Sequence, residues 1–165
     1  MIPSLAAGVL VRDLRALRRE IEAYPTEADL WRVAPGITNS GGNLALHLAG
    51  NLQHFIGKAL GHTGYVRTRD AEFQSRDVPR AQLLAAIDRT IAAVETGLAR
   101  LENQDLSVDF PEPLAGRRVS TADALLHLLT HCAYHLGQVD YHRRLITGQA
   151  TTVGAMAPGE LRSVK

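Results

Sequence analysis

Four stretches of the chain repeat apolar residues every three or four positions, and this pattern constrains the fold more than any other feature. The spacing is that of a helix that buries one face. The stretches lie at about 4–24, 39–60, 77–101 and 120–148, and segments rich in proline, glycine and polar residues separate them. Four helices of about twenty residues or more can enclose one core. The chain is therefore predicted to be all-α and to form a four-helix bundle.

Residues at the ends of these stretches support the boundaries. Pro25 follows the first stretch and stops it, and Pro79 is suited to the first turn of the third. The fourth opens with Ser120 followed three residues later by Asp123, a capping signature in which Asp replaces the more usual Glu. Gly148 is placed to end the same helix. The fourth helix is therefore predicted to be the longest.

The length of 165 residues suits one domain with its own hydrophobic core. We expect a single domain over residues 1–165, with 149–165 forming a C-terminal tail that is frayed or wrapped around the bundle. The connections at 61–78 and 102–119 carry no readable motif, and a short extended piece is expected at 106–110. Connections of this length allow several topologies, so the order of the helices stays open.

Charge and hydropathy exclude several classes of protein. The formal net charge is +1, and acids and bases are interspersed, so no basic field is available to bind nucleic acid. The apolar run Leu5–Val11 is too short for a membrane span, and no basic region precedes it as in a signal peptide. A lone cysteine, Cys132, fits a reducing compartment. We expect a cytoplasmic protein without nucleic-acid or membrane partners.

Histidine is the residue type that points to a function. The seven histidines are His47, His54, His62, His127, His131, His135 and His142. Three of them, His127, His131 and His135, step by four residues along the predicted fourth helix, so their rings share one face. Chance produces such a three-step ladder only about 0.01 times in a chain of this composition. Two neighbouring histidines of this series can chelate one metal ion.

A metal site in a protein needs three or four ligands, so a further ligand has to come from another helix. The predicted second helix offers two histidines seven residues apart, His47 among leucines and His54 beside Phe55. A buried imidazole needs a partner, because an unsatisfied polar group costs roughly 1–3 kcal/mol. A metal ion is such a partner, and so is a hydroxyl or a carbonyl group. The spacing alone leaves a metal site and ordinary hydrogen-bonded histidines equally open.

Two motifs are similar to those of the DinB superfamily. Residues 43–52 read Asn-Leu-Ala-Leu-His-Leu-x-Gly-Asn-Leu, and residues 128–138 read Leu-Leu-x-His-Cys-Ala-Tyr-His-Leu-Gly-Gln. The hallmark of that family is one histidine in helix two and His-x-x-x-His followed by x-Gly-Gln in helix four. The resemblance spans nearly the whole chain. At Leu136 the sequence departs from the arginine that many members carry.

The resemblance implies a four-helix bundle in which His47, His131 and His135 bind one divalent metal ion. Gln138 lies three residues beyond the last of these histidines, and Asn51 lies four beyond the first. Both are placed to orient ligands or bound water, or else to fill the bundle interior as polar residues without a metal role.

The other histidines and the cysteine carry weaker signals. His54 is secondary to the ligand set, His127 is expected on a helix face, and His142, beside two arginines, is expected at the surface. His62 lies in a predicted turn. Cys132 follows a ladder histidine directly and so points about 100° away around the helix, which makes it a poor fourth ligand.

Three neutral nitrogens leave a bound ion its full charge and at least one open position, as in catalytic sites. An all-imidazole site suits zinc, nickel, copper or iron, and we expect zinc first and nickel second. Water at the open position ionises near neutral pH, and a thiol is deprotonated outright. Hydrolysis and thiol transfer are both open on the residues alone, and no individual catalytic residue is singled out.

Characterised members of the family that the chain resembles include transferases and isomerases that use small thiols such as bacillithiol or mycothiol. The resemblance therefore implies a metal-dependent thiol S-transferase, whose partners are a low-molecular-weight thiol and an electrophilic substrate. A metal-dependent hydrolase is the second hypothesis, although no acidic residue shares the histidine faces as a general base. The third is a non-enzymatic, stress-induced metal-binding or interaction protein. Family members commonly dimerise, so a homodimer is also expected.

Overall fold

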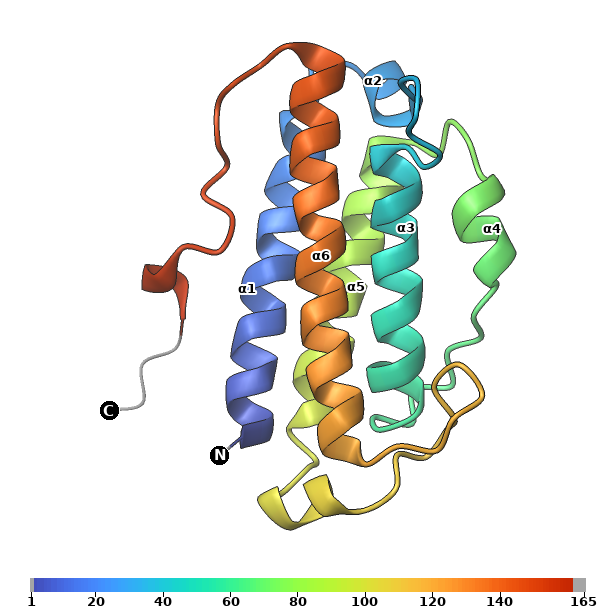
Figure 1. Cartoon of the computed structure of the whole chain (residues 1–165), viewed down its shortest axis with the longest axis vertical. Helices are drawn as coiled ribbons and strands as arrows, with labels where there is room; N and C mark the ends of the chain where they lie inside the picture. Colours follow the sequence, from blue (N-terminus) through green and yellow to red (C-terminus); the bar gives the residue numbers. More distant parts are fainter. Residues whose placement is uncertain (1, 162–165) are drawn as a thin grey trace.

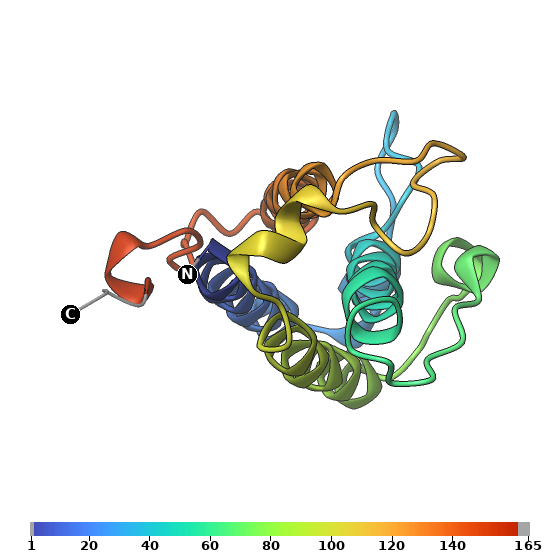
Figure 2. The same ribbon diagram turned by 90° about the horizontal axis from the view of Figure 1, so that it is seen from below.

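The computed structural model describes residues 2–161, and four long helices dominate it (Figure 1). They are α1 (Ile2–Ala23), α3 (Gly41–Leu52), α5 (Arg80–Leu98) and α6 (Thr121–Thr147). Seen end-on, they stand at the corners of a quadrilateral in which α1 and α3 are each flanked by α5 and α6 (Figure 2). α1 and α6 run in one direction, and α3 and α5 run in the other (Figure 1). The prediction of an all-α four-helix bundle is confirmed.

The core is the shared inner face of these helices. The apolar stripe of α1, formed by Leu10, Leu14, Leu17 and Ile21, is fully buried. Burying one such side chain contributes about 1.5–3 kcal/mol, so this packing fixes the helices against one another. None of the helices among residues 2–161 is long and apolar enough to cross a membrane. Apolar side chains from the other three helices complete the core: Leu48, Leu52, Ile87, Val94, Leu128 and Val139.

The ends of α6 follow from its capping residues, whereas no side chain caps the start of α5. The Ser120 hydroxyl oxygen accepts a hydrogen bond from the Asp123 N–H at 3.1 Å, and the hydroxyl donates to the Asp123 carboxylate at 2.7 Å. Gly148 has a φ of 70°, the left-handed conformation that closes α6 as predicted. The third predicted helix begins later than expected. α5 starts at Arg80, so Pro79 lies before the helix and not in its first turn.

Two short helices lie outside the bundle, and the sequence did not predict either. α2 (Glu27–Trp31) follows α1, and α4 (Arg69–Gln74) lies beside α3 (Figure 1). They have five and six residues, which is too short to show a helical period. α4 matters most for function, because it brings polar residues against α3.

Irregular helical turns occupy two further connections. α3 continues as a π-helical turn, η1 (Gln53–Lys58), so the helical stretch ends close to the predicted position. A 3₁₀ turn, η2 (Asn103–Ser107), takes up the first part of the predicted extended piece at 106–110. Val108 has an extended backbone, Asp109 forms an isolated bridge with Ser120, and the Phe110 N–H donates to the Val119 carbonyl oxygen at 2.9 Å. The prediction is therefore wrong at 106–107 and agrees with the structure at 108–110.

The chain after α6 turns back beside α1 (Figure 1). Arg19 of α1 donates to the Val153 carbonyl oxygen at 2.9 Å and to the Glu160 carboxylate, in the 3₁₀ turn η3 (Pro158–Glu160), at 2.9 Å. Arg143 of α6 donates to the Thr151 carbonyl oxygen at 2.8 Å. The tail predicted at 149–165 therefore lies against the bundle as far as Glu160, and its residues 162–165 lie outside the described residues.

Candidate metal centre

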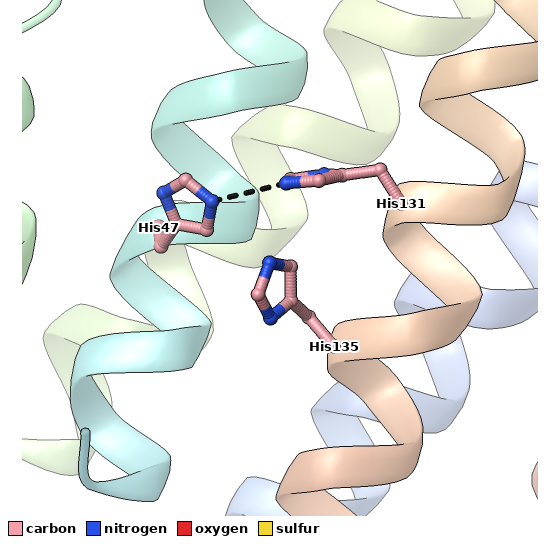
Figure 3. A group of neighbouring side chains, drawn as sticks. All are labelled: His47, His131 and His135. Atoms are coloured by element: carbon pink, nitrogen blue, oxygen red, sulfur yellow. Dashed lines mark hydrogen bonds between the residues drawn. The ribbon is translucent and has the colours of Figure 1, made fainter. Parts of the chain in front are cut away.

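Three histidines meet where α3 and α6 face each other (Figure 3). His47 lies on α3, and His131 and His135 lie one turn apart on α6. One ring nitrogen from each residue lies within 4.8 Å of the other two. The ring centroids are 5.1 Å apart for His47 and His131, 5.0 Å for His47 and His135, and 4.5 Å for the α6 pair. The structure therefore brings together the three histidines that the sequence predicted as a set.

The start of α3 places His47 and also anchors the neighbouring α4. The hydroxyl oxygen of Ser40 caps α3 by accepting from the Asn43 N–H at 3.2 Å. The Asn43 side-chain amide donates to the carbonyl oxygens of Glu72 and Ser75, each at 3.0 Å. These bonds hold the last turn of α4 against the first turn of α3, one turn away from His47.

The ring of His47 is oriented by Glu72 of α4. The Nδ1–H of His47 donates to Oε2 of Glu72 at 2.9 Å, and Arg67 donates to both oxygens of that carboxylate at 2.7 and 2.8 Å. Burial acts to raise the pKa of Glu72, but the hydrogen bonds from Arg67 and His47 outweigh it, and the net pKa lies below the usual value. The ionised carboxylate holds the proton on Nδ1, so the Nε2 lone pair faces the other two histidines.

Gly50 allows Glu72 to lie this close to α3. A Cβ atom at Gly50 would overlap Oε1 of Glu72, so a glycine is needed at this position of the helix. Glu72 and Arg67 come from the connection in which the sequence showed no motif, and sequence analysis missed both. The available signal was Gly50 itself, a glycine inside a helix three residues after His47. Such a glycine indicates a close neighbour without saying which residue it is.

The ring of His135 is oriented in the same way by Gln138. The Nδ1–H of His135 donates to the Gln138 side-chain oxygen at 2.6 Å. One ring nitrogen of His135 points toward the other two rings (Figure 3). The sequence placed Gln138 and Asn51 as residues that could orient a ligand, and Gln138 makes such a contact. Asn51 is buried, but its amide oxygen has no hydrogen-bond partner among residues 2–161.

His131 is the most perturbed member of the cluster. Burial, helped by the neighbouring His135 and His47, lowers the pKa of His131 from 6.5 to about 4, so its ring is neutral at pH 7. Burial also lowers the pKa of His135. The Nε2 atoms of His47 and His131 are 3.2 Å apart, while Nδ1 of His131 is buried without a partner among residues 2–161. Because His47 carries its proton on Nδ1, only His131 can supply the proton between the two Nε2 atoms.

This donor set fits a divalent metal ion. Ring nitrogens converge from two helices, and in two of the rings the second nitrogen is held by Glu72 or Gln138, as is usual for metal-ligating histidines. Of residues 2–161, no aspartate, glutamate or cysteine joins the cluster. Neutral ligands leave an ion its full positive charge and an open position. The three histidines can therefore hold a metal ion and present it to a further ligand.

Three other histidines do not join this ligand group, in agreement with the sequence, although His127 contacts the ring of His131. Nε2 of His54 lies 2.8 Å from the carboxylate of Glu112. His127 is exposed one turn before His131, and the two ring centroids are 5.7 Å apart. His62 is exposed in the turn after η1, with a φ of 55°.

The prediction that His142 lies at the surface is wrong. Its side chain is buried, the hydroxyl of Tyr24 lies 2.7 Å from its Nδ1, and its Nε2 lies 2.8 Å from the carbonyl oxygen of Arg32. Exposure was expected because two arginines follow in the sequence. Arg143 is, however, itself buried in an ion pair with Glu20 of α1. The neighbouring Arg143 therefore suggested exposure of His142 wrongly, because Glu20 neutralises the charge of Arg143 inside the bundle.

Cys132 takes no part in the site. Its side chain is buried on the core side of α6, and burial, with a further contribution from Asp13, raises the pKa of its thiol. A thiol of this kind is a poor ligand and a poor nucleophile at neutral pH. This agrees with the prediction that Cys132 is badly placed as a fourth ligand.

Comparison with known proteins agrees with this geometry. The family model described as the DinB superfamily matches residues 10–139, which is more than half of the chain and includes all three clustered histidines. A comparison with curated proteins finds no match to the chain. The bundle, the histidine cluster and the match over α3, α5 and most of α1 and α6 lead to one conclusion: the chain belongs to the DinB superfamily.

Proposed function

We propose that the protein is a metal-dependent thiol S-transferase that holds one divalent ion on His47, His131 and His135. The observation that carries this proposal is the donor set, in which three imidazoles converge without a carboxylate among the described residues. A divalent ion in such a set supplies a Lewis acid that ionises a small thiol. The expectation drawn from the family resemblance points to the same chemistry.

The proposed reaction joins the sulfur of a low-molecular-weight thiol to an electrophilic carbon. The S–C bond forms, the bond from that carbon to its leaving group breaks, and the thiol proton passes to solvent. The chain holds the rings in place, through Glu72 at His47 and Gln138 at His135. Because the pKa of His131 is about 4, that ring takes up no proton at neutral pH and stays available as a ligand.

The position of Glu72 favours a thiol over water as the nucleophile. A general base within reach of the attacking water assists a hydrolase. Glu72 already accepts hydrogen bonds from Arg67 and His47, on the side of the His47 ring away from the cluster. An ionised thiol needs no such base, because its sulfur is itself the nucleophile. We propose zinc as the metal, with nickel or iron as alternatives, and the reducing cytoplasm as the compartment.

Metal analysis tests the first part of this proposal. Wild type and the triple variant His47→Ala, His131→Ala, His135→Ala are compared after loosely bound metal is removed, with the double variant His62→Ala, His127→Ala as a control outside the cluster. We expect near one equivalent of metal in the wild type and the control, and little in the triple variant. Negligible metal in all three proteins after reconstitution contradicts the proposal.

Turnover tests the second part. Zinc-loaded protein is assayed with 1-chloro-2,4-dinitrobenzene and either bacillithiol or mycothiol, and the thiol-dependent loss of the electrophile should vanish in His131→Ala. Loss that persists in this variant refutes the proposal. Ester hydrolysis without any thiol favours the hydrolase instead. No turnover of electrophiles or esters, with stability unchanged by chelators, favours a non-enzymatic role.

A further inference from the structure

A cavity lies one to two helical turns from the histidine cluster, between residues 36–39, the first turns of α3 and the last turns of α6. Its volume is about 430 Å³, within the range of small-molecule sites. Its walls come from Ile37, Leu44 and Leu145, with Tyr141 at the rim. The cavity therefore has the size and the apolar lining that a small organic ligand requires.

Gln138 connects this cavity to the histidine cluster. It lines the cavity, and its side-chain oxygen accepts the hydrogen bond from Nδ1 of His135 at 2.6 Å. On the other wall, Leu44 lies on α3 three residues before His47. A ligand in the cavity that contacts Gln138 thus lies one side chain away from His135.

The lining, as far as the described residues form it, contains no formal charge. No aspartate, glutamate, lysine or arginine is among these residues, and their polar groups are amides and hydroxyls, such as those of Asn39, Thr38 and Gln138. His142 also lines the cavity, but both ring nitrogens are occupied, by the Tyr24 hydroxyl and the Arg32 carbonyl oxygen. A carboxylate or phosphate in this space would find no cationic side chain among the lining residues to offset what hydration it loses.

The wall formed by residues 36–39 has a defined conformation. The Ile37 N–H donates to the Ala34 carbonyl oxygen at 3.0 Å and closes a turn. Gly36 in this turn has a φ of 81°, which glycine adopts without strain. Ser40, which follows directly, caps α3. The turn and the cap together hold Ile37 over the cavity, so the cavity is a formed part of the fold.

From these observations we infer that the cavity binds an uncharged, largely apolar or aromatic molecule. Its ligand is the electrophilic substrate of the reaction proposed above, and that assignment rests on the proposed function, whereas binding itself does not. The amides of Gln138 and Asn39 supply hydrogen bonds to a neutral polar group of the ligand, and the apolar walls contact its body.

Two probes of one shape but different charge test this inference. The full-length chain, with and without zinc, is titrated by calorimetry with 2-naphthol, which is neutral at pH 7, and with 2-naphthoate, which is an anion. We expect 2-naphthol to bind at least about tenfold more tightly than 2-naphthoate, because the anion is desolvated without a partner. Equal affinity, or no binding of 2-naphthol, overturns the inference.

A pair of variants locates the binding. Leu145 and Leu126 are exposed to the same degree, 60% and 61%, on the same helix, but only Leu145 lines the cavity. Leu145→Arg should reverse the preference in favour of 2-naphthoate, and Leu126→Arg should leave it unchanged. An effect of Leu126→Arg, or none of Leu145→Arg, overturns the inference. If 2-naphthol fails to bind while zinc binds and thiol transfer occurs, only the cavity assignment is wrong. If 2-naphthol binds to a protein that binds no zinc, only the proposed function is wrong.

Discussion

At the scale of single residues, Glu72 controls the basicity and orientation of the His47 ring through its Nδ1 atom. It accepts from Nδ1 of His47 and is itself neutralised by Arg67. An anionic partner on the far nitrogen increases the basicity of a histidine ligand and fixes its orientation. The same carboxylate, if it faced the open side, would reduce the charge of a bound ion. Its placement therefore strengthens the ligand while leaving the ion fully charged.

The substitution Glu72→Gln should weaken metal binding without removing it. The glutamine side chain keeps a hydrogen-bond acceptor but loses the charge, and loss of such a partner typically lowers metal affinity about 10- to 100-fold. The measurement is a zinc competition against a chelator of known affinity. Glu112→Gln is the matched control, because Glu112 makes a similar contact to His54 outside the cluster. An equal loss in both variants contradicts a specific role for Glu72.

The metal-free protein should lose stability as the pH falls from about 6.5 toward 4. His131 has a pKa of about 4 in the fold and 6.5 in the unfolded chain, so within this window the unfolded chain binds the extra proton. The loss from this residue is about 1–3 kcal/mol after allowance for its partial exposure. Urea unfolding at several pH values measures it. His131→Gln should show a shallower dependence, and an unchanged slope contradicts the assignment.

The three clustered histidines and Gln138 could be predicted from the sequence, but Glu72 and Arg67 could not. His131 and His135 share a helix face by spacing alone, and the family motif adds His47. Glu72 approaches through a connection whose path depends on tertiary packing, so no local period encodes its contact with His47. His142 shows the converse case, because its burial depends on packing between α1, α2 and α6 that local sequence does not reveal.

At the scale of helices, two glycines should respond in opposite ways to the same substitution. Gly50→Ala would place a Cβ against Glu72 and push the carboxylate away from His47, so metal affinity should fall. At Gly137, inside α6, nothing lies within 4 Å of an added Cβ. Gly137→Ala should therefore gain about 0.5–1 kcal/mol of stability through helix propensity and keep its metal. Thermal unfolding measures the stability of both variants, and zinc competition measures their metal affinity. Zinc binding by Gly50→Ala as tight as that of the wild type contradicts the role given to Gly50.

The four long helices could be predicted because each buries a stripe at a regular spacing. The predicted and observed helix ends agree best where the sequence contains a capping residue, as at Ser120 and Gly148 of α6. α2 and α4 escaped prediction because they bury few residues and derive their stability from contacts with the bundle. The direction of α5 also could not be predicted, because the long connection after η1 permits either orientation.

At the scale of the whole molecule, Arg143 and Glu20 join α6 to α1 by a fully buried ion pair. Arg143→Met should destabilise the protein by about 3–5 kcal/mol, because it leaves the Glu20 carboxylate buried without its partner. Adding Glu20→Gln should recover part of this loss. Urea unfolding measures both variants, and metal content should stay near the wild-type level. Equal losses in the single and double variants would show that packing of the arginine side chain, and not the stranded charge, carries the effect.

The separation of the histidines along the chain has a consequence for how the protein matures. His47 and His131 are 84 residues apart, and they come from helices that run in opposite directions. During translation α3 is synthesised long before α6. A nascent chain that does not yet include α6 therefore carries His47 but neither His131 nor His135. An ion held on all three histidines can be acquired only after α6 has been synthesised and has docked on α3. Loading with metal then follows the synthesis and docking of α6, and it depends on the ion that is available to the folded bundle.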